Sequence, residues 1–575
     1  MIFTVISEAV RIGCSRVRNC NQLELSGPVT WPPGFCCKWV RIIFSCRNLP
    51  HILKMQDHKK NQKYPFSGCG IAGIMPLGGP PIARSVVEAM TSSLSHRGPS
   101  GHGIWENTSG IFFGHHRLSI QDLSERGHQP MERGPICITY NGEVYNFHDL
   151  RLELEQAGYK FSSWTDTEVI LRAYERWGLA CFEKFNGMFA LAIWDDRTHE
   201  LILARDRLGI KPLYYSLVGG YLIFASEVQT LLRSGILKNE IDGHTIFRQY
   251  NLGSILGYEE GRTCIDNVLE FPPAHWAVVR LTGEMRLNKY WQLPYEKGPV
   301  VSEGRLSAEL RALFNDSIRL RLVSDVPVAA FLSGGLDSSS IVASAASLLK
   351  AYQLKTLTVW YTEGYAATRW GKEENDLKYA RLLARHLAKR IEHDIVEVGV
   401  SALSLENLDS VMDFARIPDH IREIAMFYNY RAVKDAGVRV VLNGQGSDEI
   451  MGGYMGLGGF PDYLLFSRSP DTDLMERFFP SLLLSTRKDI LNPEVLQDSQ
   501  NIYRDFMRHL YSFEGELIEK GHRLLVDTQL RQFIHMEDFL SMHFGVECRL
   551  PFLDYRLVQW VFRQPFGIHI DQHTR

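Results

Sequence analysis

The sequence predicts an α/β protein built of two parts, a layered α/β sandwich followed by a doubly wound parallel sheet. Short apolar runs split by turn residues fill the chain from residue 69 to about 290, and such runs are typical of strands. From about residue 305, apolar strands alternate with amphipathic helices, which is the order found in parallel sheets. A Gly/Ser-rich loop that joins one of these strands to a helix agrees with the second half of this prediction.

In the first part, short apolar segments predict buried strands over residues 69–75 (CGIAGIM) and 136–142 (ICITYNG). Residues 187–206 predict a hairpin, because two apolar runs flank the polar turn DDRTHE. Apolar residues recur at helical spacing over 166–178. Strands with a few helices between them favour a sandwich of layers.

The second part is predicted to alternate helix and strand. The expected elements are a helix over 308–322, a strand over 326–332, a helix over 338–352, a strand over 354–361, a helix over 376–390 and a strand over 438–444. Apolar strands of this kind are buried on both faces, so we expect helices to cover both faces of the sheet. Residues 293–305, rich in proline, glycine and charges, are the predicted link between the parts.

The first 68 residues differ from the rest, because they are basic and contain few acids. They carry no clear secretory signal. A transit peptide, a true translation start at Met55, or a wrongly read upstream stretch would each account for them. We therefore expect a leader over 1–68 outside the fold, a first domain over 69–292 and a second domain over 305–575.

Composition argues against several classes of function. The net charge of -3 over 575 residues does not favour a nucleic acid or an anionic membrane as the main partner. No run reaches the roughly 18 consecutive apolar residues that a membrane helix needs. The cysteines from Cys69 onward show no CxxC pairs and no metal-type spacing. This distribution predicts a reduced, cytoplasmic protein.

The loop over residues 332–340 (LSGGLDSSS) is the strongest local signal. Its glycines allow successive backbone N–H groups to turn toward one anion, and the start of the next helix adds further donors. Asp337 and Ser338 are placed to hold Mg²⁺ or a phosphate oxygen. The loop resembles the SGGxDS loop of the PP-loop ATP pyrophosphatases. The simpler interpretation is a Gly/Ser turn that only joins a strand to a helix.

A second glycine-rich cluster, LNGQGSDEIMGGY, occupies residues 442–454 after another predicted strand. Asp448 and Glu449 offer carboxylates to a metal ion or an ammonium group. At the end of a neighbouring strand in the same sheet, this cluster would lie where doubly wound folds bind ligands. The alternative is a flexible acidic loop.

A series of spaced motifs runs from Cys69 to about Val561. They are CGIAGI (69–74), HRGP (96–99), HHRLSI (115–120), YNGEVYN (140–146), DTEVIL (166–171), the NGMFALAIWD hairpin, RDRLGIKPLYY (205–215), SEV (226–228), SGGLDSSS, GSDE (446–449) and VECRLPFLD (546–554). Together they resemble the glutamine-hydrolysing asparagine synthetases. The resemblance implies an N-terminal-nucleophile glutaminase followed by a PP-loop synthetase.

The resemblance implies that Cys69 is the catalytic nucleophile of the first part. In this family the cysteine is the first residue of the mature chain, and its own α-amino group, with a pKa of about 8, takes the thiol proton. The thiolate attacks the amide carbon of glutamine, and the Asn141 side chain and the Gly142 N–H stabilise the oxyanion. Taken alone, Cys69 would more often be a small buried hydrophobe.

The same resemblance implies how glutamine is bound. Arg117 would clamp the substrate carboxylate, while Glu143 and Asp166 would hold its ammonium group. The full expected set is Arg117, Leu118, Ser119, Ile120, Asn141, Gly142, Glu143 and Asp166. Taken singly, Arg117 or Asp166 would more often be a solvated surface charge.

The second part is implied to bind ATP·Mg²⁺ and aspartate and to form β-aspartyl-AMP and pyrophosphate. The expected ATP and pyrophosphate ligands are Leu332, Ser333, Gly334, Gly335, Asp337, Ser338, Val359, Asn443 and Gly444. Asp337 and Asp448 resemble the family's Mg²⁺ ligands. Ammonia would reach the adenylate through an internal channel, giving asparagine, AMP and glutamate. No nucleic-acid or membrane partner is expected, and a homodimer is common in the family.

Three features depart from the family pattern. Cys69 follows Ser67 and Gly68, so the catalytic amine exists only if the chain is cut before Cys69. Gln445 stands where many members have an acidic residue linked with forming the adenylate, and an amide can neither act as a base nor carry charge. The chain ends soon after VECRLPFLD, and its last residues, IDQHTR, contain no lysine. We expect this truncation to weaken or abolish synthetase activity, because the family's C-terminal lysine contacts the phosphates.

Alternatives to asparagine synthesis remain at this stage. An amidotransferase of the same build could act on another carboxylate, such as a cell-wall or peptide group, and Gln445 favours this slightly. A catalytically silent binding partner, blocked at Cys69, is a different class of answer. A tRNA-modifying enzyme fits poorly, because the body of the chain is not basic.

Overall fold

The computed structural model describes residues 69–98, 100–243, 245, 261–349, 352–362, 374–399, 422–453 and 508–565. The predicted leader over 1–68 and the last residues, 566–575, lie outside the described residues. All elements named below belong to one unit of the chain, residues 65–575. Among the described helices, none has both the length and the apolar character to cross a membrane.

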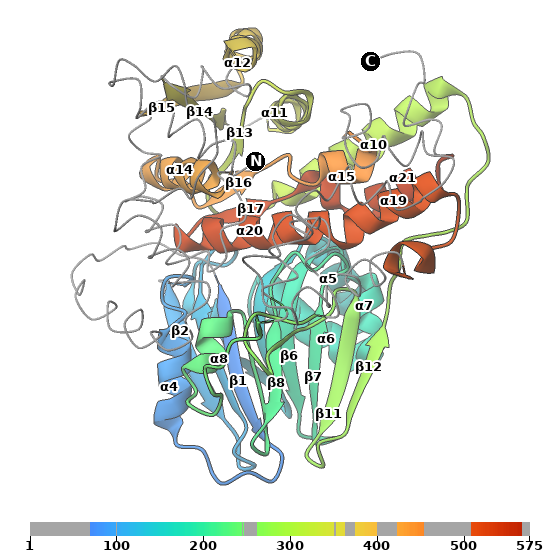
Figure 1. Cartoon of the computed structure of the whole chain (residues 1–575). Helices are drawn as coiled ribbons and strands as arrows, with labels where there is room; N and C mark the ends of the chain where they lie inside the picture. The colour runs from blue at the N-terminus through green and yellow to red at the C-terminus, as the bar shows by residue number, and fades with distance from the viewer. Residues whose placement is uncertain are drawn as a thin grey trace, which may run out of the picture. The chain divides into compact units, whose positions relative to one another are not determined.

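Two six-stranded antiparallel sheets form the first part (Figure 1). The first sheet contains, in spatial order, β10 (Leu269–Glu270), β8 (Tyr214–Val218), β9 (Tyr221–Ala225), β1 (Gly70–Pro76), β3 (Phe112–Arg117) and β2 (Gly101–Glu106). The second contains β12 (Met285–Lys289), β11 (His275–Arg280), β7 (Glu200–Arg205), β6 (Gly187–Asp195), β5 (Ile136–Val144) and β4 (Met131–Arg133).

Successive side chains along each strand point to opposite faces of the sheet, and this builds the layers of the first part. On β1, Ile71 and Met75 lie in the core between the two sheets, whereas Ala72 and Ile74 pack toward α4 (Arg84–Ser92). The outer face of the second sheet packs against helices in the same way. The other helices are α5 (Phe147–Gln156), α6 (Asp166–Trp177), α7 (Cys181–Lys184) and α8 (Val228–Leu232). The predicted layered α/β sandwich is confirmed.

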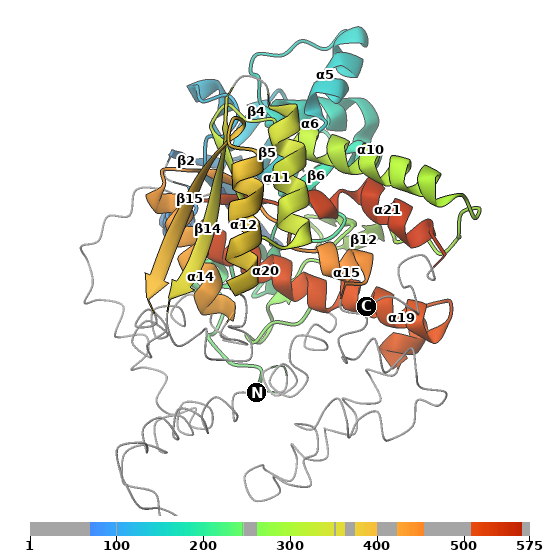
Figure 2. The same ribbon diagram turned by 90° about the horizontal axis from the view of Figure 1, so that it is seen from above.

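A five-stranded parallel sheet forms the second part, in the order β15 (Ile391–Gly399), β14 (Leu354–Thr362), β13 (Val328–Phe331), β16 (Val440–Leu442) and β17 (Glu547–Arg549). Its helices are α10 (Glu303–Arg321), α11 (Leu336–Leu348), α12 (Glu374–His386), α14 (Arg422–Asp435), α15 (Ser447–Met451), α19 (Leu517–Asp527), α20 (Gln529–His543) and α21 (Tyr555–Arg563). Helices α14 and α20 pack on one face, and α10, α11 and α12 pack on the other (Figure 2). The predicted doubly wound parallel sheet is therefore confirmed.

The strand order of this sheet reverses between β13 and β16. From β13 the chain continues to β14 and β15 on one side, whereas β16 and β17 lie on the other. Ligands of open parallel sheets bind at the carboxyl ends of the strands beside such a reversal. Both glycine-rich clusters found in the sequence follow these two central strands.

Several predicted element bounds were wrong at their ends. In order, the predicted elements 308–322, 326–332, 338–352, 354–361, 376–390 and 438–444 correspond to the observed α10, β13, α11, β14, α12 and β16. Helix α10 begins earlier than predicted, at Glu303. The prediction missed this turn because its residues are polar and show no apolar periodicity. Strand β16 ends at Leu442, where Asn443 donates its N–H to the Arg549 carbonyl (3.0 Å) and the chain turns.

The two parts share hydrophobic clusters. One joins Tyr145, Met188, Leu208 and Ile210 of the first part to β16, α14 and α20 of the second. Another joins Leu118, Ile120 and the partly buried Cys69 to β13, β16 and α11. Cys69 and its neighbours Leu118 and Ile120 are therefore packed into the core of the second part.

Candidate active sites

Cys69 lies directly before β1, with its thiol half-buried. The Leu118 N–H donates to its Sγ (3.2 Å), and its own carbonyl accepts from Nε of Arg97 (2.9 Å). Burial raises the pKa of the Cys69 thiol to about 12, and the carboxylates of Glu547 and Glu143 raise it further. At neutral pH this thiol is protonated, so it needs a base before it can act as a nucleophile.

Asn141 and Gly142 lie side by side on β5. Asn141 is only 1% exposed, and no acceptor among the described residues contacts its Nδ2. A buried donor without a partner costs about 1–3 kcal/mol, so an acceptor supplied by a ligand would be favoured there. Gly142 has φ +143°, and a Cβ on it would overlap the Met188 carbonyl oxygen. Only glycine fits this close approach of β5 to β6.

Replacing Gly142 by alanine is expected to lower the free energy of unfolding by about 1–3 kcal/mol, because positive φ and a rigid backbone neighbour act together. Denaturant unfolding measures this. Gly134→Ala is the matched control, because Gly134 also has positive φ (+57°) but nothing lies within 4 Å of its added Cβ. An equal loss in both variants would contradict the packing argument.

Two buried carboxylates lie near this strand. Asp166, the first residue of α6, accepts on Oδ2 from the Tyr140 hydroxyl (2.7 Å) and the Val144 N–H (2.9 Å). Glu143 accepts from Nε2 of Gln121, and Nη2 of Arg549 lies 3.5 Å from its Oε1. Burial raises the pKa of Glu143 well above its usual range and that of Asp166 to about 6.

The raised pKa of Asp166 predicts an unusual dependence of stability on pH. The native state keeps this proton up to about pH 6, whereas the unfolded chain releases it near its ordinary value of 3.8. Raising the pH from about 4 to about 6 should therefore lower the free energy of unfolding, by about 3 kcal/mol from this group. Denaturant unfolding at several pH values should reveal this loss and find it absent in Asp166→Asn. The same slope in both proteins would refute it.

Arg117 is the last residue of β3, and its side chain binds the loop that follows. Its guanidinium donates to the carbonyl oxygens of Ser124 (3.0 Å), Gln121 (3.2 Å) and Asp122 (2.5 Å). Gly127 makes room for it, since a Cβ there would overlap Nη2. Within the described chain, these bonds leave Nε and one N–H of Nη1 for a substrate carboxylate.

Three other expected glutamine ligands, Leu118, Ser119 and Ile120, lie in what we call the thiol segment, residues 118–122. Leu118 touches the Cys69 thiol through its backbone. The Ser119 N–H donates to the Ser100 hydroxyl (3.3 Å). The Ile120 carbonyl accepts from the Asp325 N–H (3.0 Å), a residue of the second part.

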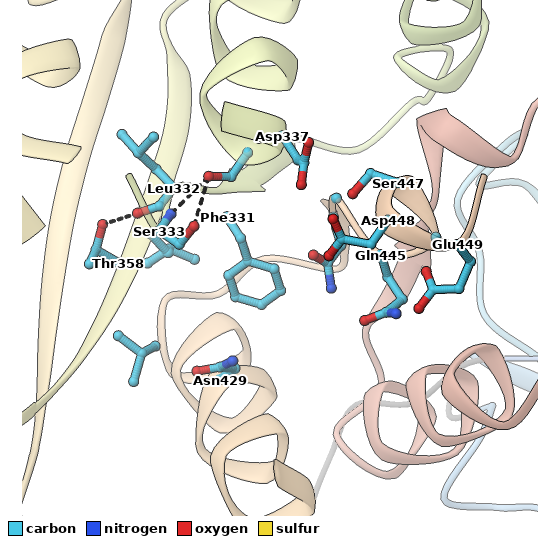
Figure 3. A pocket seen from close by; sticks show the side chains of 16 residues that line it. Phe331, Leu332, Ser333, Asp337, Thr358, Asn429, Gln445, Ser447, Asp448 and Glu449 are labelled. Carbon is cyan, nitrogen blue, oxygen red and sulfur yellow. Dashed lines mark hydrogen bonds between the residues drawn. The ribbon is translucent and has the colours of Figure 1, made fainter. Parts of the chain in front are cut away.

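A cavity of about 290 Å³ opens at the carboxyl ends of β13 and β16, beside the middle of β14 (Figure 3). Of the residues expected from sequence, it is lined by Leu332, Ser333, Asp337, Ser338, Val359, Asn443, Gly444, Gln445 and Asp448. Gly334 and Gly335 do not line it. Gly334 (φ +99°) instead packs against α12, where a Cβ would overlap the Asp376 carbonyl oxygen.

The loop over residues 332–338, here called the pyrophosphate loop, is held by its own hydroxyls. Oγ of Ser333 and Oγ of Ser338 lie 2.9 Å apart, and the Gly335 N–H donates to Ser333 Oγ (3.3 Å). The Thr358 hydroxyl donates to the Leu332 carbonyl (Figure 3). Helix α11 begins at Leu336, so its first N–H groups lie at this loop.

Carboxylates from both glycine-rich clusters reach the same cavity. Asp337 and Asp448 both line it. A Cβ on Gly444 would lie 3.2 Å from Cβ of Asp337, so the two clusters touch. In the described part of the chain, no group of three His, Cys, Asp or Glu side chains could hold a metal ion by itself. Mg²⁺ is commonly bound by one or two carboxylates together with substrate phosphates, and Asp337 and Asp448 fit that requirement.

Two known protein families match this chain. Residues 68–291 match the glutamine amidotransferase domain, and residues 309–575 match asparagine synthase. Asparagine synthetase [glutamine-hydrolyzing] 3 of Bacillus subtilis (strain 168) is 31% identical over 527 residues, which are 87% of this chain and 81% of the relative. The chain belongs to the glutamine-hydrolysing asparagine synthetase family.

Two further similar proteins are not named as asparagine synthetases. Amidase chry2 of Gibberella zeae is 27% identical over 550 residues, 84% of this chain and 79% of the relative. Among solved structures, the glutamine phosphoribosylpyrophosphate amidotransferase of B. subtilis shares 14% identity and a TM-score of 0.32 over 61% of this chain and 94% of its own. A likeness that weak carries no argument about the site of this asparagine synthetase family member.

Gln445 lies in the cavity of this asparagine synthetase family member beside Asp448 and Glu449 (Figure 3). Its amide can donate and accept hydrogen bonds but adds no charge.

Sequence reasoning missed Glu537, a buried carboxylate behind the cavity. It lies on α20, is 2% exposed, and accepts on Oε1 from the Tyr430 hydroxyl, Nδ2 of Asn443 and the Cys548 thiol (3.3 Å). Burial raises the pKa of this carboxyl. The signal that could have revealed it is the acidic pair Glu537–Asp538, which interrupts the apolar residues FI (533–534) and FL (539–540) of one helix.

The neighbouring residue, Asp538, joins the two parts of the asparagine synthetase fold. Its carboxylate accepts from Nη2 of Arg97 (2.6 Å) and Nζ of Lys211 (2.9 Å), both from the first part and both almost fully buried. Arg97 also contacts Glu227 (3.1 Å). These cations hold the pKa of Asp538 below its usual value against the effect of burial.

Strand β17 faces both sites. Glu547 and Arg549 pair with each other (2.7 Å), and Arg549 reaches Glu143 in the first part. Cys548, which points the opposite way, donates to Glu537 behind the cavity. The motif VECR therefore lies between the thiol site and the cavity.

Proposed function

We propose that this protein makes asparagine from aspartate, using ATP and ammonia from glutamine, through β-aspartyl-AMP. The observation that carries the proposal is one shared hydrophobic cluster. It contains Cys69 and Leu118 of the thiol site together with Leu332 and Leu442, from which the two cavity loops begin. Two reaction sites joined by one core suit a transfer of ammonia that avoids bulk water. We also propose a glutaminase domain over 69–292 and a synthetase domain over 305–575.

In the glutaminase reaction, the α-amine of a Cys69 freed by cleavage takes the thiol proton. The thiolate attacks the amide carbon of glutamine, and the oxygen becomes an oxyanion that accepts from Asn141 Nδ2 and the Gly142 N–H. Each such donor lowers the barrier by about 3–4 kcal/mol. Ammonia leaves, and water cleaves the thioester to glutamate. Glu143 and Asp166 hold the substrate ammonium, and Arg117 holds its carboxylate.

In the synthetase reaction, the aspartate carboxylate attacks the α-phosphorus of ATP, and the bond to pyrophosphate breaks. The hydroxyls of Ser333 and Ser338 and the start of α11 hold the departing pyrophosphate. Mg²⁺, held by Asp337 and Asp448, would neutralise charge on the transferring group. Ammonia then attacks the acyl carbon of the adenylate, and AMP leaves.

A second candidate is an amidotransferase of the same build that acts on another carboxylate. Gln445 favours it, because a neutral amide stands in the cavity where many family members have an acidic residue. A relative that is 27% identical to this chain is named as an amidase, which agrees with this candidate.

The test supplies a chain cut to begin at Cys69 with amide-¹⁵N glutamine, aspartate and ATP·Mg²⁺ and looks for ¹⁵N-asparagine by mass spectrometry. Labelled asparagine is the expected product. Release of pyrophosphate only with a different carboxylate, in a screen with ammonia supplied directly, would establish the second candidate instead. Asp337→Asn, which keeps the shape but not the charge, should lose pyrophosphate release. Absence of pyrophosphate with every carboxylate would refute both candidates.

A further inference from the structure

The thiol segment is tied to the second part at two points by one residue. The Asp122 N–H donates to Oδ2 of Asp325 (2.8 Å), and the Asp325 N–H donates to the Ile120 carbonyl (3.0 Å). The first of these bonds joins residues 203 positions apart in sequence. The carboxylate acceptor makes the first of them charge-assisted.

Asp122 has an unusual backbone conformation that depends on its hydrogen bonds. Its φ of +47° is uncommon for a residue with a side chain, and such a conformation persists when the surroundings hold it. Besides Asp325, the Trp164 N–H donates to its Oδ2 (2.9 Å), and Arg117 donates to its carbonyl (2.5 Å). Loss of the Asp325 contact would leave only the contacts made within the first part.

The other end of this connection leads to the cavity. Asp325 lies just before β13, and the pyrophosphate loop follows β13 directly. Val326, next to Asp325, packs in the same cluster as Leu118 and Ile120. A change at the pyrophosphate loop can therefore reach the thiol through one strand and one pair of hydrogen bonds, because packed elements transmit displacement.

We propose that Asp325 is a positioning residue that couples the two sites. It holds Ile120 and Asp122, and thereby keeps Leu118 against the Cys69 thiol and Arg117 in place for glutamine. Nucleotide in the cavity stabilises this arrangement and so tightens glutamine binding, and by linkage glutamine tightens nucleotide binding. The inference rests on the proposed function of both sites.

The experiment measures the KM for glutamine with and without α,β-methylene-ATP·Mg²⁺. In the unmodified protein the analogue is expected to lower KM by about fivefold or more. Asp325→Ala should lose most of that effect, with little change in kcat for ammonia-dependent pyrophosphate release. Asp325→Asn should retain it, because an amide oxygen can accept from the Asp122 N–H. Asp435→Ala is the matched control, since Asp435 is exposed and pairs within its own helix, with Arg431 (3.8 Å).

An unchanged effect of the analogue in Asp325→Ala would overturn the proposal, as would equal losses in Asp325→Ala and Asp435→Ala. Hydrogen exchange gives a readout that needs no catalysis. The analogue should slow exchange of the amides over residues 118–122 in the unmodified protein and not in Asp325→Ala. If the unmodified protein releases no pyrophosphate at all, the proposed function fails. The exchange result then decides the coupling separately: no difference between the two proteins would sink it.

Discussion

A chain cut so that it begins at Cys69 is expected to hydrolyse glutamine about 10³-fold faster than the same chain with Gly68 left in place. The thiol pKa of about 12 leaves very little thiolate at neutral pH. A free α-amine, with a pKa of about 8, can remove that proton, whereas the nitrogen of a peptide bond cannot. Positioned general bases typically contribute 10²- to 10⁴-fold.

The rate of glutamate release from glutamine measures this effect. Ammonia-dependent pyrophosphate release serves as the internal control and should be equal in the two chains, because it does not use Cys69. Cys69→Ala in the trimmed chain should release no glutamate. Equal glutaminase rates with and without Gly68 would mean that another group acts as the base.

Asp538→Ala is expected to lower the free energy of unfolding by about 3–5 kcal/mol. The change leaves Lys211 and one side of Arg97 buried without their partner, and breaking one member of a buried ion pair costs this much. The contact joins the two parts, so the variant should also loosen their packing. Denaturant unfolding at pH 7 measures the loss.

The control for this prediction is an exposed pair of the same chemistry. Glu88→Ala removes an ion pair with Arg84 (3.3 Å) in which both side chains are about half exposed, and should cost about 0.5 kcal/mol or less. A similar small loss in Asp538→Ala would show that water reaches Asp538 and that the pair is not desolvated.

Local patterns in the sequence were enough to predict the class of both sheets. The hairpin over 187–206 became β6 and β7, and the helix over 166–178 became α6. These elements are long, strongly patterned and bounded by clear turn residues, which is where periodicity is most informative. The beginning of α10 was not predicted, because its first turn is polar and shows no apolar periodicity.

The contacts between the parts could not be predicted in this way. Nothing local to the HRGP or GIKP motifs says that Arg97 and Lys211 meet on Asp538, because that depends on how whole elements pack. Glu537 and Asp325 were missed for the same reason. The roles assigned to the individual glutamine and ATP ligands, and the domain bounds, stay predictions that the experiments above address.

Strand β17 has a consequence for how such an enzyme can change over time. Arg549 pairs with Glu547 and reaches Glu143 of the first part, whereas Cys548 between them donates to Glu537 behind the cavity. A substitution at these positions that improves one activity is expected to change the other activity too, because both sites contact the same three-residue strand. Libraries randomised over Glu547–Arg549 should therefore yield variants that trade one activity against the other. New substrate ranges are more readily acquired by substitutions in the cavity lining, at positions that contact only one of the two sites.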